Sequence, residues 1–141
     1  MKIIILHYHL LPGGVTRIIQ SQIQALSNQF EVVVLTGYKP ENGKFNSQNT
    51  KILKELNYLD HQLEFEQQKT ILKKIKDFFY TNINKEDIIH VHNPNLGKNP
   101  LITIGLKELA DKNYNLFFHI HDLSEDRPEN QKFLKTIINR F

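Results

Sequence analysis

The first 26 residues, MKIIILHYHLLPGGVTRIIQSQIQAL, decide the fold class. The apolar and largely β-branched run at residues 2–6 predicts a strand buried on both faces, as in the middle of a parallel sheet. A turn at residues 12–14 breaks this run, and apolar residues return at helical spacing over residues 15–26. The order strand, glycine turn, helix is therefore the opening unit of an α/β domain.

The glycine turn is a candidate ligand site. The backbone N–H groups of residues 14–17 would lie at a helix N-terminus, where they lack intrahelical acceptors and the helix dipole favours an anion. Gly13 and Gly14 carry no side chain, so a phosphate or a sugar hydroxyl can approach the main chain closely. A plain tight turn also explains two adjacent glycines, and both interpretations stay open on these residues alone.

Composition limits the classes of protein that this chain can form. With 141 residues it has room for one domain that buries most of its apolar surface. It contains no cysteine, which excludes disulfides and thiolate metal sites and suits a reducing cytoplasm. No secretory signal or transmembrane run is recognisable, so we expect a cytoplasmic protein. The net charge of +3 permits peripheral contact with the inner face of a membrane.

Strand and helix patterns alternate along the rest of the chain. A second buried strand is predicted at residues 31–36 and further strands at 87–91 and 115–120, with helices at 69–80, 100–110 and around the apolar residues 133–138. A polar, turn-rich loop is expected at 38–50, and a third strand at either 56–59 or 63–65. This alternation predicts an α/β fold, a Rossmann-like doubly wound parallel sheet with helices on both faces.

The helix predicted at 69–80 has one apolar face and four lysines elsewhere. A basic amphipathic helix can lie on anionic lipid. The simpler interpretation, which we favour, is a crossover helix that packs on the sheet and turns its lysines to solvent.

Six of the seven histidines form three His-x-His pairs, each at the carboxyl end of a predicted strand. These pairs are His7/His9, His90/His92 and His119/His121. Residues two apart on a strand point to the same side, and open α/β sheets bind ligands outside the carboxyl ends of their strands. We therefore expect the first, fourth and fifth strands to be neighbours, and the histidine pairs and the glycine turn to surround one cleft.

Other chemistries fit the sequence less well. Paired histidines could chelate zinc or iron for hydrolysis, with Asp122 as an oxygen ligand, but carboxylates are missing from the ends of the first and fourth strands. We therefore assign no metal ligand and no cofactor. There is no nucleophile elbow, no Gly-x-Gly-x-x-Gly fingerprint, and no basic stripe with interleaved aromatic residues for nucleic acid.

Three segments together resemble a known family: HYHLLPGGVTRII, DIIHVHNPNLGKNPLI and FFHIHDLSEDRPENQKFL. In this order they look like the N-terminal half of a glycosyltransferase of the GT-B fold, of the family 4 type. The resemblance implies two Rossmann-like domains across a cleft, an N-terminal one for the acceptor and a C-terminal one for the nucleotide-sugar donor. It further implies transfer with retention of the anomeric configuration and no essential metal.

The resemblance also implies roles for individual residues. Gly13 and Gly14 would form a flexible turn that faces the donor phosphates. His121 matches the family's histidine near the transferred sugar, and it is the candidate catalytic residue. His92 and Asn93 would line the acceptor side.

Three charged residues complete the predicted substrate-binding set. Arg17, in the first helix, and Arg127 could make charge-assisted bonds to a phosphate or to an acidic acceptor. Pairing of Arg127 with a neighbouring acid, Glu125 or Asp126, is an equally good account of that residue. Asp122 belongs to the HIHD motif of the resemblance.

The sequence departs from the family because it stops before a second domain. We therefore expect an acceptor-binding domain that is inactive without its donor-binding partner, whose acceptor is a glycan, a lipid-linked sugar or a small molecule. Two alternatives are a free-standing binding module or subunit of a split transferase, and the histidine-rich metal hydrolase.

Overall fold

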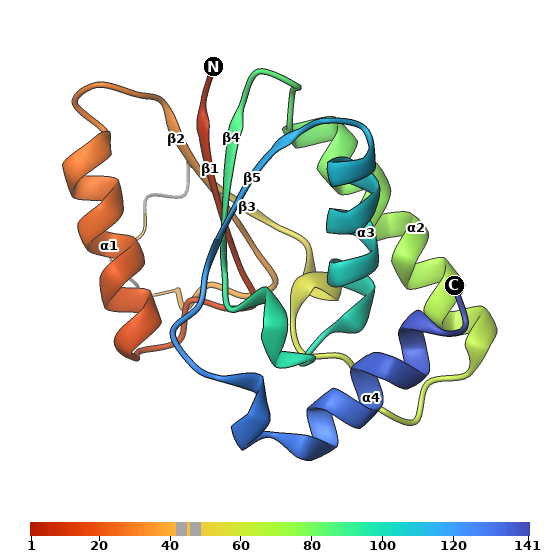
Figure 1. The fold of residues 1–141 in the computed structure, drawn as a ribbon. Helices are drawn as coiled ribbons and strands as arrows, with labels where there is room; N and C mark the ends of the chain where they lie inside the picture. Colours follow the sequence, from red (N-terminus) through yellow and green to blue (C-terminus); the bar gives the residue numbers. More distant parts are fainter. Residues whose placement is uncertain (42–44, 46–48) are drawn as a thin grey trace.

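A computed structural model of the protein describes residues 1–41, 45 and 49–141. In this part of the chain, five parallel strands form one sheet in the order β3-β2-β1-β4-β5, and helices cover it on both faces (Figure 1). The predicted parallel α/β architecture is confirmed. Part of the polar loop expected at 38–50 falls on 42–44 and 46–48, which lie outside the described residues.

The elements follow the predicted alternation closely. The strands are β1 (Ile3–His7), β2 (Val32–Thr36), β3 (Thr50–Ile52), β4 (Ile88–His92) and β5 (Asn115–His119). The helices are α1 (Gly14–Leu26), α2 (Phe65–Asn82), α3 (Pro100–Asp111) and α4 (Pro128–Ile138), with short 3₁₀ turns at Lys54–Leu56, Pro94–Leu96 and Ser124–Asp126.

Strand β1 is the centre of the sheet. All five of its residues are buried, as the apolar run predicts, and it pairs with β2 on one side and β4 on the other. The strand order therefore reverses between β1 and β4, which is where α/β sheets place their ligands. The first, fourth and fifth strands are consecutive in the sheet, as expected.

Alternate residues of β1 separate two hydrophobic layers. Ile3 and Ile5 pack with Ile19 of α1 on one face, while Ile4 and Leu6 belong to a larger cluster with α2, α3 and α4 on the other.

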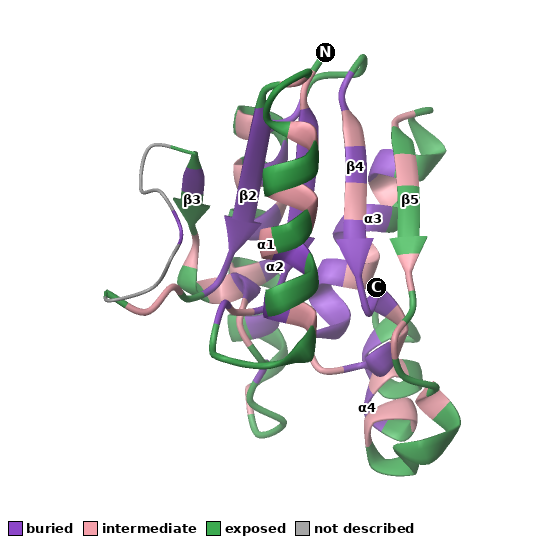
Figure 2. Ribbon diagram, turned by 90° about the vertical axis from the view of Figure 1, so that its left-hand side faces the viewer, coloured by how far each residue is buried: buried purple, intermediate pink, exposed green. Residues whose placement is uncertain are grey.

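Figure 2 shows α1 in front of the sheet and most of β5 exposed at its edge. On β5, Phe117 is 58% exposed and Phe118 is 56% exposed. The edge strand β5 is therefore largely exposed, whereas Ile88 of β4 packs against the α1-side cluster.

The prediction for the third strand was wrong. β3 is a three-residue edge strand that pairs with the end of β2, and neither 56–59 nor 63–65 forms a strand. Leu56 and Leu59 are apolar because their side chains are buried in the α2-side cluster from a 3₁₀ turn and the loop after it. Phe65 is the first residue of α2.

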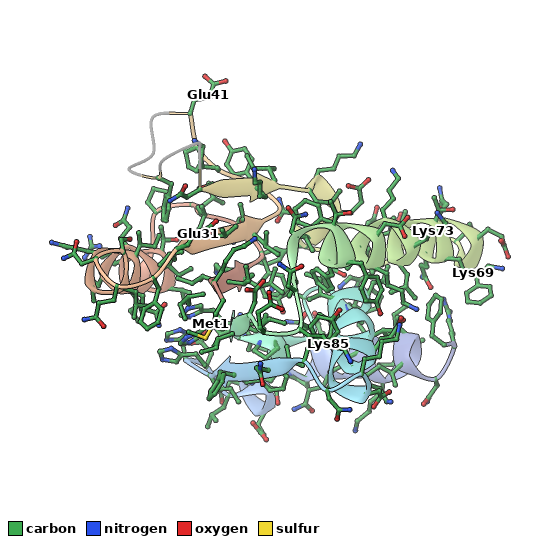
Figure 3. All side chains as sticks on the ribbon, turned by 90° about the horizontal axis from the view of Figure 1, so that it is seen from above. Met1, Glu31, Glu41, Lys69, Lys73 and Lys85 are labelled. Atoms are coloured by element: carbon green, nitrogen blue, oxygen red, sulfur yellow. The ribbon has the colours of Figure 1, made fainter. Side chains whose placement is uncertain are left out.

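Helix α2 begins one turn earlier than predicted. The side-chain oxygen of Gln67 accepts a hydrogen bond from the backbone N–H of Glu64, which completes a capping box. The lysines of this helix are paired with acids: Lys69 with Glu66, Lys73 with Asp77, Lys74 with Glu55 and Lys76 with Glu108. Figure 3 shows Lys69 and Lys73 on α2, at the surface of the molecule.

Nowhere in residues 1–41, 45 and 49–141 does a helix combine the length and the apolar character that crossing a bilayer requires.

Gly37 holds the corner where β2 ends beside β1. Its N–H donates to the carbonyl oxygen of Tyr8 at 2.9 Å. A Cβ at position 37 would lie 2.7 Å from that same oxygen and would also collide with the backbone nitrogen of Asn57. Three backbone segments therefore meet at a point that has room only for hydrogen.

Replacement of Gly37 by alanine should lower the free energy of unfolding by about 1–3 kcal/mol or more, because the backbone must move to relieve the overlap. The matched control is Gly14→Ala. A Cβ there meets nothing within 4 Å, and alanine favours a helix by at most about 1 kcal/mol. Urea unfolding of both variants checks this; equal stability of Gly37→Ala and wild type would contradict it.

Candidate functional site

The carboxyl ends of β1, β4 and β5 are joined by one residue, Asn93. It follows β4 directly and adopts a left-handed conformation, with φ of 54° and ψ of 44°, which asparagine tolerates better than most residues. Its backbone N–H donates to the carbonyl of His119 at 2.8 Å, and its own carbonyl accepts from the hydroxyl of Tyr8 at 3.1 Å. The main chain of this corner thus contacts both neighbouring strand ends.

The side chain of Asn93 fixes the loop after β5. Its Oδ1 accepts from the backbone N–H of His121 at 2.7 Å, and its Nδ2 donates to Oδ2 of Asp122 at 3.0 Å. Asn93 is 2% exposed, so its end of each bond is buried, while Asp122 lies at the surface. It thereby sets the position of His121 and Asp122 relative to the sheet.

A pocket of about 200 Å³ opens beside this corner. It brings together five of the eight predicted site residues, namely Gly13, Gly14, Asn93, Asp122 and Arg127. Two further residues of its lining, Tyr58 and Lys98, were not predicted as site residues. The Lys98 ammonium lies 5.0 Å from the Tyr58 ring centroid, and the Tyr58 hydroxyl lies 3.1 Å from Nε2 of His9.

The other three predicted residues lie outside this pocket. Arg17 lines a separate cavity of about 740 Å³ between α1, β2 and the segment before β3, whose wall includes Phe45 and Asn49 next to residues outside the described set. His92 and His121 belong to a cluster of histidines on the α1 face of the sheet.

Two cations at the pocket have no acidic partner. Among the described residues, neither Lys98 nor Arg127 forms an ion pair with a carboxylate. The pairing of Arg127 with Glu125 or Asp126 that the sequence left open is therefore not formed. The carboxylate of Asp122 is bonded to the Asn93 amide instead. The pocket is thus able to attract an anion.

The two glycines of the turn are not required by crowding. Gly13 has an extended backbone, and a Cβ there would approach only the carbonyl of Leu11, at 3.9 Å. A Cβ at Gly14 would meet nothing within 4 Å. The hydroxyl of Thr16 donates to the Leu11 carbonyl at 2.6 Å and so closes the turn onto α1. Within the described part of the chain no neighbouring group explains the missing side chains, and the first N–H groups of α1 face the pocket.

Six histidines form a continuous series of ring contacts. His9 contacts His7, His7 contacts His92, and His92 contacts the remaining three, with centroid separations of 4.8–6.1 Å. All seven histidines are described, and His61 alone lies elsewhere, stacked on Phe133. The predicted convergence of the three pairs is therefore present, although only His7 and His9 line the pocket.

Burial lowers the pKa of several of these rings. Desolvation lowers the pKa of His7 from 6.5 to about 4, and desolvation together with the neighbouring His90 and His7 lowers that of His92 to about 3. The pKa of His121 is also lowered, by desolvation and by His119. Near neutral pH the cluster therefore offers imidazole groups that both donate and accept hydrogen bonds.

These pKa values predict a loss of stability in mild acid. Between about pH 6.5 and 4 the unfolded chain binds more protons than the native one, so the free energy of unfolding should fall as the pH falls through this window and stay level just above it. Urea unfolding at a series of pH values measures the slope. His7→Gln should reduce it, whereas His61→Gln, which keeps both buried rings, should follow the wild-type curve. If His7→Gln leaves the slope of stability against pH unchanged, the lowered pKa of His7 is contradicted.

Comparison with known proteins gives one informative similarity. The chain is 28% identical over 148 aligned positions to the mannosylglucosyl-3-phosphoglycerate synthase of Petrotoga mobilis, a match that covers 96% of this chain and 28% of that protein. The chain thus spans less than a third of the relative's length. No family model and no solved structure matches. The similarity supports a glycosyltransferase-type function in general.

Proposed function

We propose that this chain is the acceptor-binding, N-terminal domain of a retaining glycosyltransferase that uses a nucleotide-sugar donor. The observation that carries the proposal is the pocket at the strand-order reversal, where the glycine turn, the Asn93 corner and two unpaired cations meet. The similarity to a sugar-phosphoglycerate synthase over almost the whole chain points to the same chemistry. The GT-B arrangement and family 4 membership are part of the proposal.

The donor diphosphate is proposed to face Gly13 and Gly14. In glycosyl transfer the bond between the anomeric carbon and the diphosphate oxygen breaks, and negative charge gathers on the departing group. Open N–H groups at a helix N-terminus stabilise such charge without having to reorganise. Glycines that nothing in the fold requires fit a turn that must let phosphate oxygens approach the backbone.

The acceptor is proposed to be acidic. Lys98 and Arg127 approach the pocket from the loops after β4 and β5, and each lacks a carboxylate partner in the described part of the chain. The name of the relative includes a 3-phosphoglycerate group, which carries both a phosphate and a carboxylate. Among the acceptors the sequence left open, a small acidic molecule therefore fits these cations best.

His121 is proposed as the residue beside the transferred sugar. Its lowered pKa leaves it neutral, so it can share hydrogen bonds with sugar hydroxyls. Asn93 acts as a positioning residue, because its Oδ1 holds the His121 backbone. His92 positions His121 from the other side, because its Nδ1 lies 2.8 Å from Nε2 of His121.

Peripheral membrane contact stays a prediction. Its physical basis was the lysine face of α2, and these lysines are neutralised one by one by nearby acids. Such paired lysines attract anionic lipid less than free ones do.

Binding of 3-phosphoglycerate to the chain tests the acceptor proposal. Arg127→Gln and Lys98→Gln should each weaken binding about tenfold or more, because a charge-assisted hydrogen bond is worth about 1.5–3 kcal/mol. NMR titration gives the affinities. Lys107→Gln is the matched control, since that lysine is exposed and pairs with Asp111 on α3, and it should bind like wild type. Equal affinity of all four proteins, or no binding at all, would remove the acidic acceptor from the proposal.

The transfer reaction itself is expected only when a donor-binding domain is present. The chain alone should release no nucleoside diphosphate from a nucleotide sugar in the presence of an acceptor. In a protein that carries both domains, His121→Ala should lower kcat by about 100-fold or more, the scale of a lost polar contact to the reacting group. Turnover by the 141-residue chain, or full activity of His121→Ala, would overturn this assignment.

A further inference from the structure

Three histidines on β4 and β5 have the arrangement of a metal site. His90, His92 and His119 each offer one ring nitrogen, and these three atoms all lie within 4.8 Å of one another. From this geometry we infer that the β4–β5 edge binds one divalent transition metal ion, such as Zn²⁺, through the imidazoles of His90, His92 and His119. This site goes beyond the proposed transferase function and needs no metal in that reaction.

The backbone of β4 and β5 explains why the three rings meet. His92 and His119 are direct partners in the parallel ladder, so their side chains project from the same face of the sheet. His90 stands two residues before His92 on β4 and therefore shares that face. Two adjacent parallel strands thus present a triangle of imidazoles on a rigid support.

The ring separations already approach those of a coordinated ion. Nε2 of His90 and Nδ1 of His119 are 3.2 Å apart. Two imidazole nitrogens bound to zinc at 2.0–2.1 Å with tetrahedral angles are about 3.3 Å apart, so these two need almost no movement when the metal ion replaces the hydrogen bond between them. The third nitrogen, from His92, is within 4.8 Å of both and must shift by a fraction of that distance.

The side-chain amide of Gln22 on α1 fixes the tautomer of His92. Its Nε2 lies 2.9 Å from Oε1 of Gln22, an atom that only accepts hydrogen bonds, so this ring nitrogen carries the proton. Nδ1 then carries a lone pair, which accepts a hydrogen bond from Nε2 of His121 at 2.8 Å, and a bound metal ion would take the place of this bond. A metal-ligating histidine usually donates its other N–H to a carbonyl or carboxylate oxygen in this manner, which fixes both tautomer and orientation.

Charge and access also suit a cation. His90 and His119 are half-buried rather than enclosed, whereas His92 is buried and lies against Gln22 of α1. Neutral imidazoles without thiolates or carboxylates favour zinc, copper and nickel over magnesium or calcium.

Asp122 is not part of this group. The sequence analysis considered it as the oxygen ligand of a hydrolytic centre, but its Oδ2 accepts from the Asn93 amide. The inferred site is therefore a three-histidine clamp between β4 and the edge strand β5. A bound metal ion is expected to hold β5 against β4. Within the described sheet β5 has a neighbouring strand on one side only.

Zinc titration of untagged, chelator-treated protein tests the inference. Wild type should bind one Zn²⁺ per chain in a competition assay with a chromogenic chelator, and Co²⁺ substitution should give the visible absorption of a tetrahedral site. His90→Ala and His119→Ala should each lose at least about 100-fold in affinity for zinc. Loss of an outer-shell partner alone can cost up to about 100-fold, and these substitutions remove a ligand itself. His61→Ala removes a histidine outside the cluster and should bind like wild type.

Stability provides a second, independent readout. Saturating zinc should raise the Tm of wild type and of His61→Ala, because the metal binds only the folded arrangement, and should leave His119→Ala unchanged. Circular dichroism without metal checks that each variant is folded. If His119→Ala does not fold, His119→Gln takes its place in both assays. His121→Ala, which alters the proposed catalytic residue, should keep zinc binding. Absence of stoichiometric zinc, or wild-type affinity in His90→Ala and His119→Ala, would overturn the inference.

Discussion

The corner at Asn93 is the constraint on which the site depends. Its left-handed backbone turns the chain sharply after β4, and that conformation is strained for most residues other than glycine. Glycine would allow the turn but lacks the amide that holds the loop after β5. Asparagine satisfies both demands, because its short side chain tolerates the left-handed region and still bonds to Asp122. The pocket beside the glycine turn exists because this one residue keeps three strand ends together.

Much of the fold could be predicted because its signals are local. Buried parallel strands have continuous β-branched runs, and β1 and β2 are such runs with every residue buried. β3 escaped prediction because it has three residues, two of them exposed, and exists through its pairing with β2. The apolar residues that suggested a strand, Leu56 and Leu59, are buried from a 3₁₀ turn and the loop after it. Hydrophobic spacing reports burial reliably, but it cannot tell an edge strand from a buried turn.

The site was predictable only where strand geometry governs it. The histidine pairs were expected at one edge because residues two apart share a face, and His92 and His119 indeed pair across β4 and β5. Tyr58 and Lys98 were missed because they reach the pocket from loops, whose paths no periodicity records. The LGKNP segment contained Lys98, but nothing in the spacing shows that the residue lacks an acidic partner. Likewise, the side-chain bonds of Asn93 follow from a positive φ that the sequence does not display.

The exposed strand β5 has a consequence for the behaviour of the protein in solution. Strands at the edge of a sheet usually carry a lysine, a proline or a bulge that prevents another chain from pairing with them. β5 instead has Phe117 and Phe118 on its two faces, both more than half exposed, and the backbone row facing away from β4 is open in the described sheet. Solubility at high concentration therefore depends on what lies against this edge, and a preparation can be correctly folded and still self-associate strand to strand.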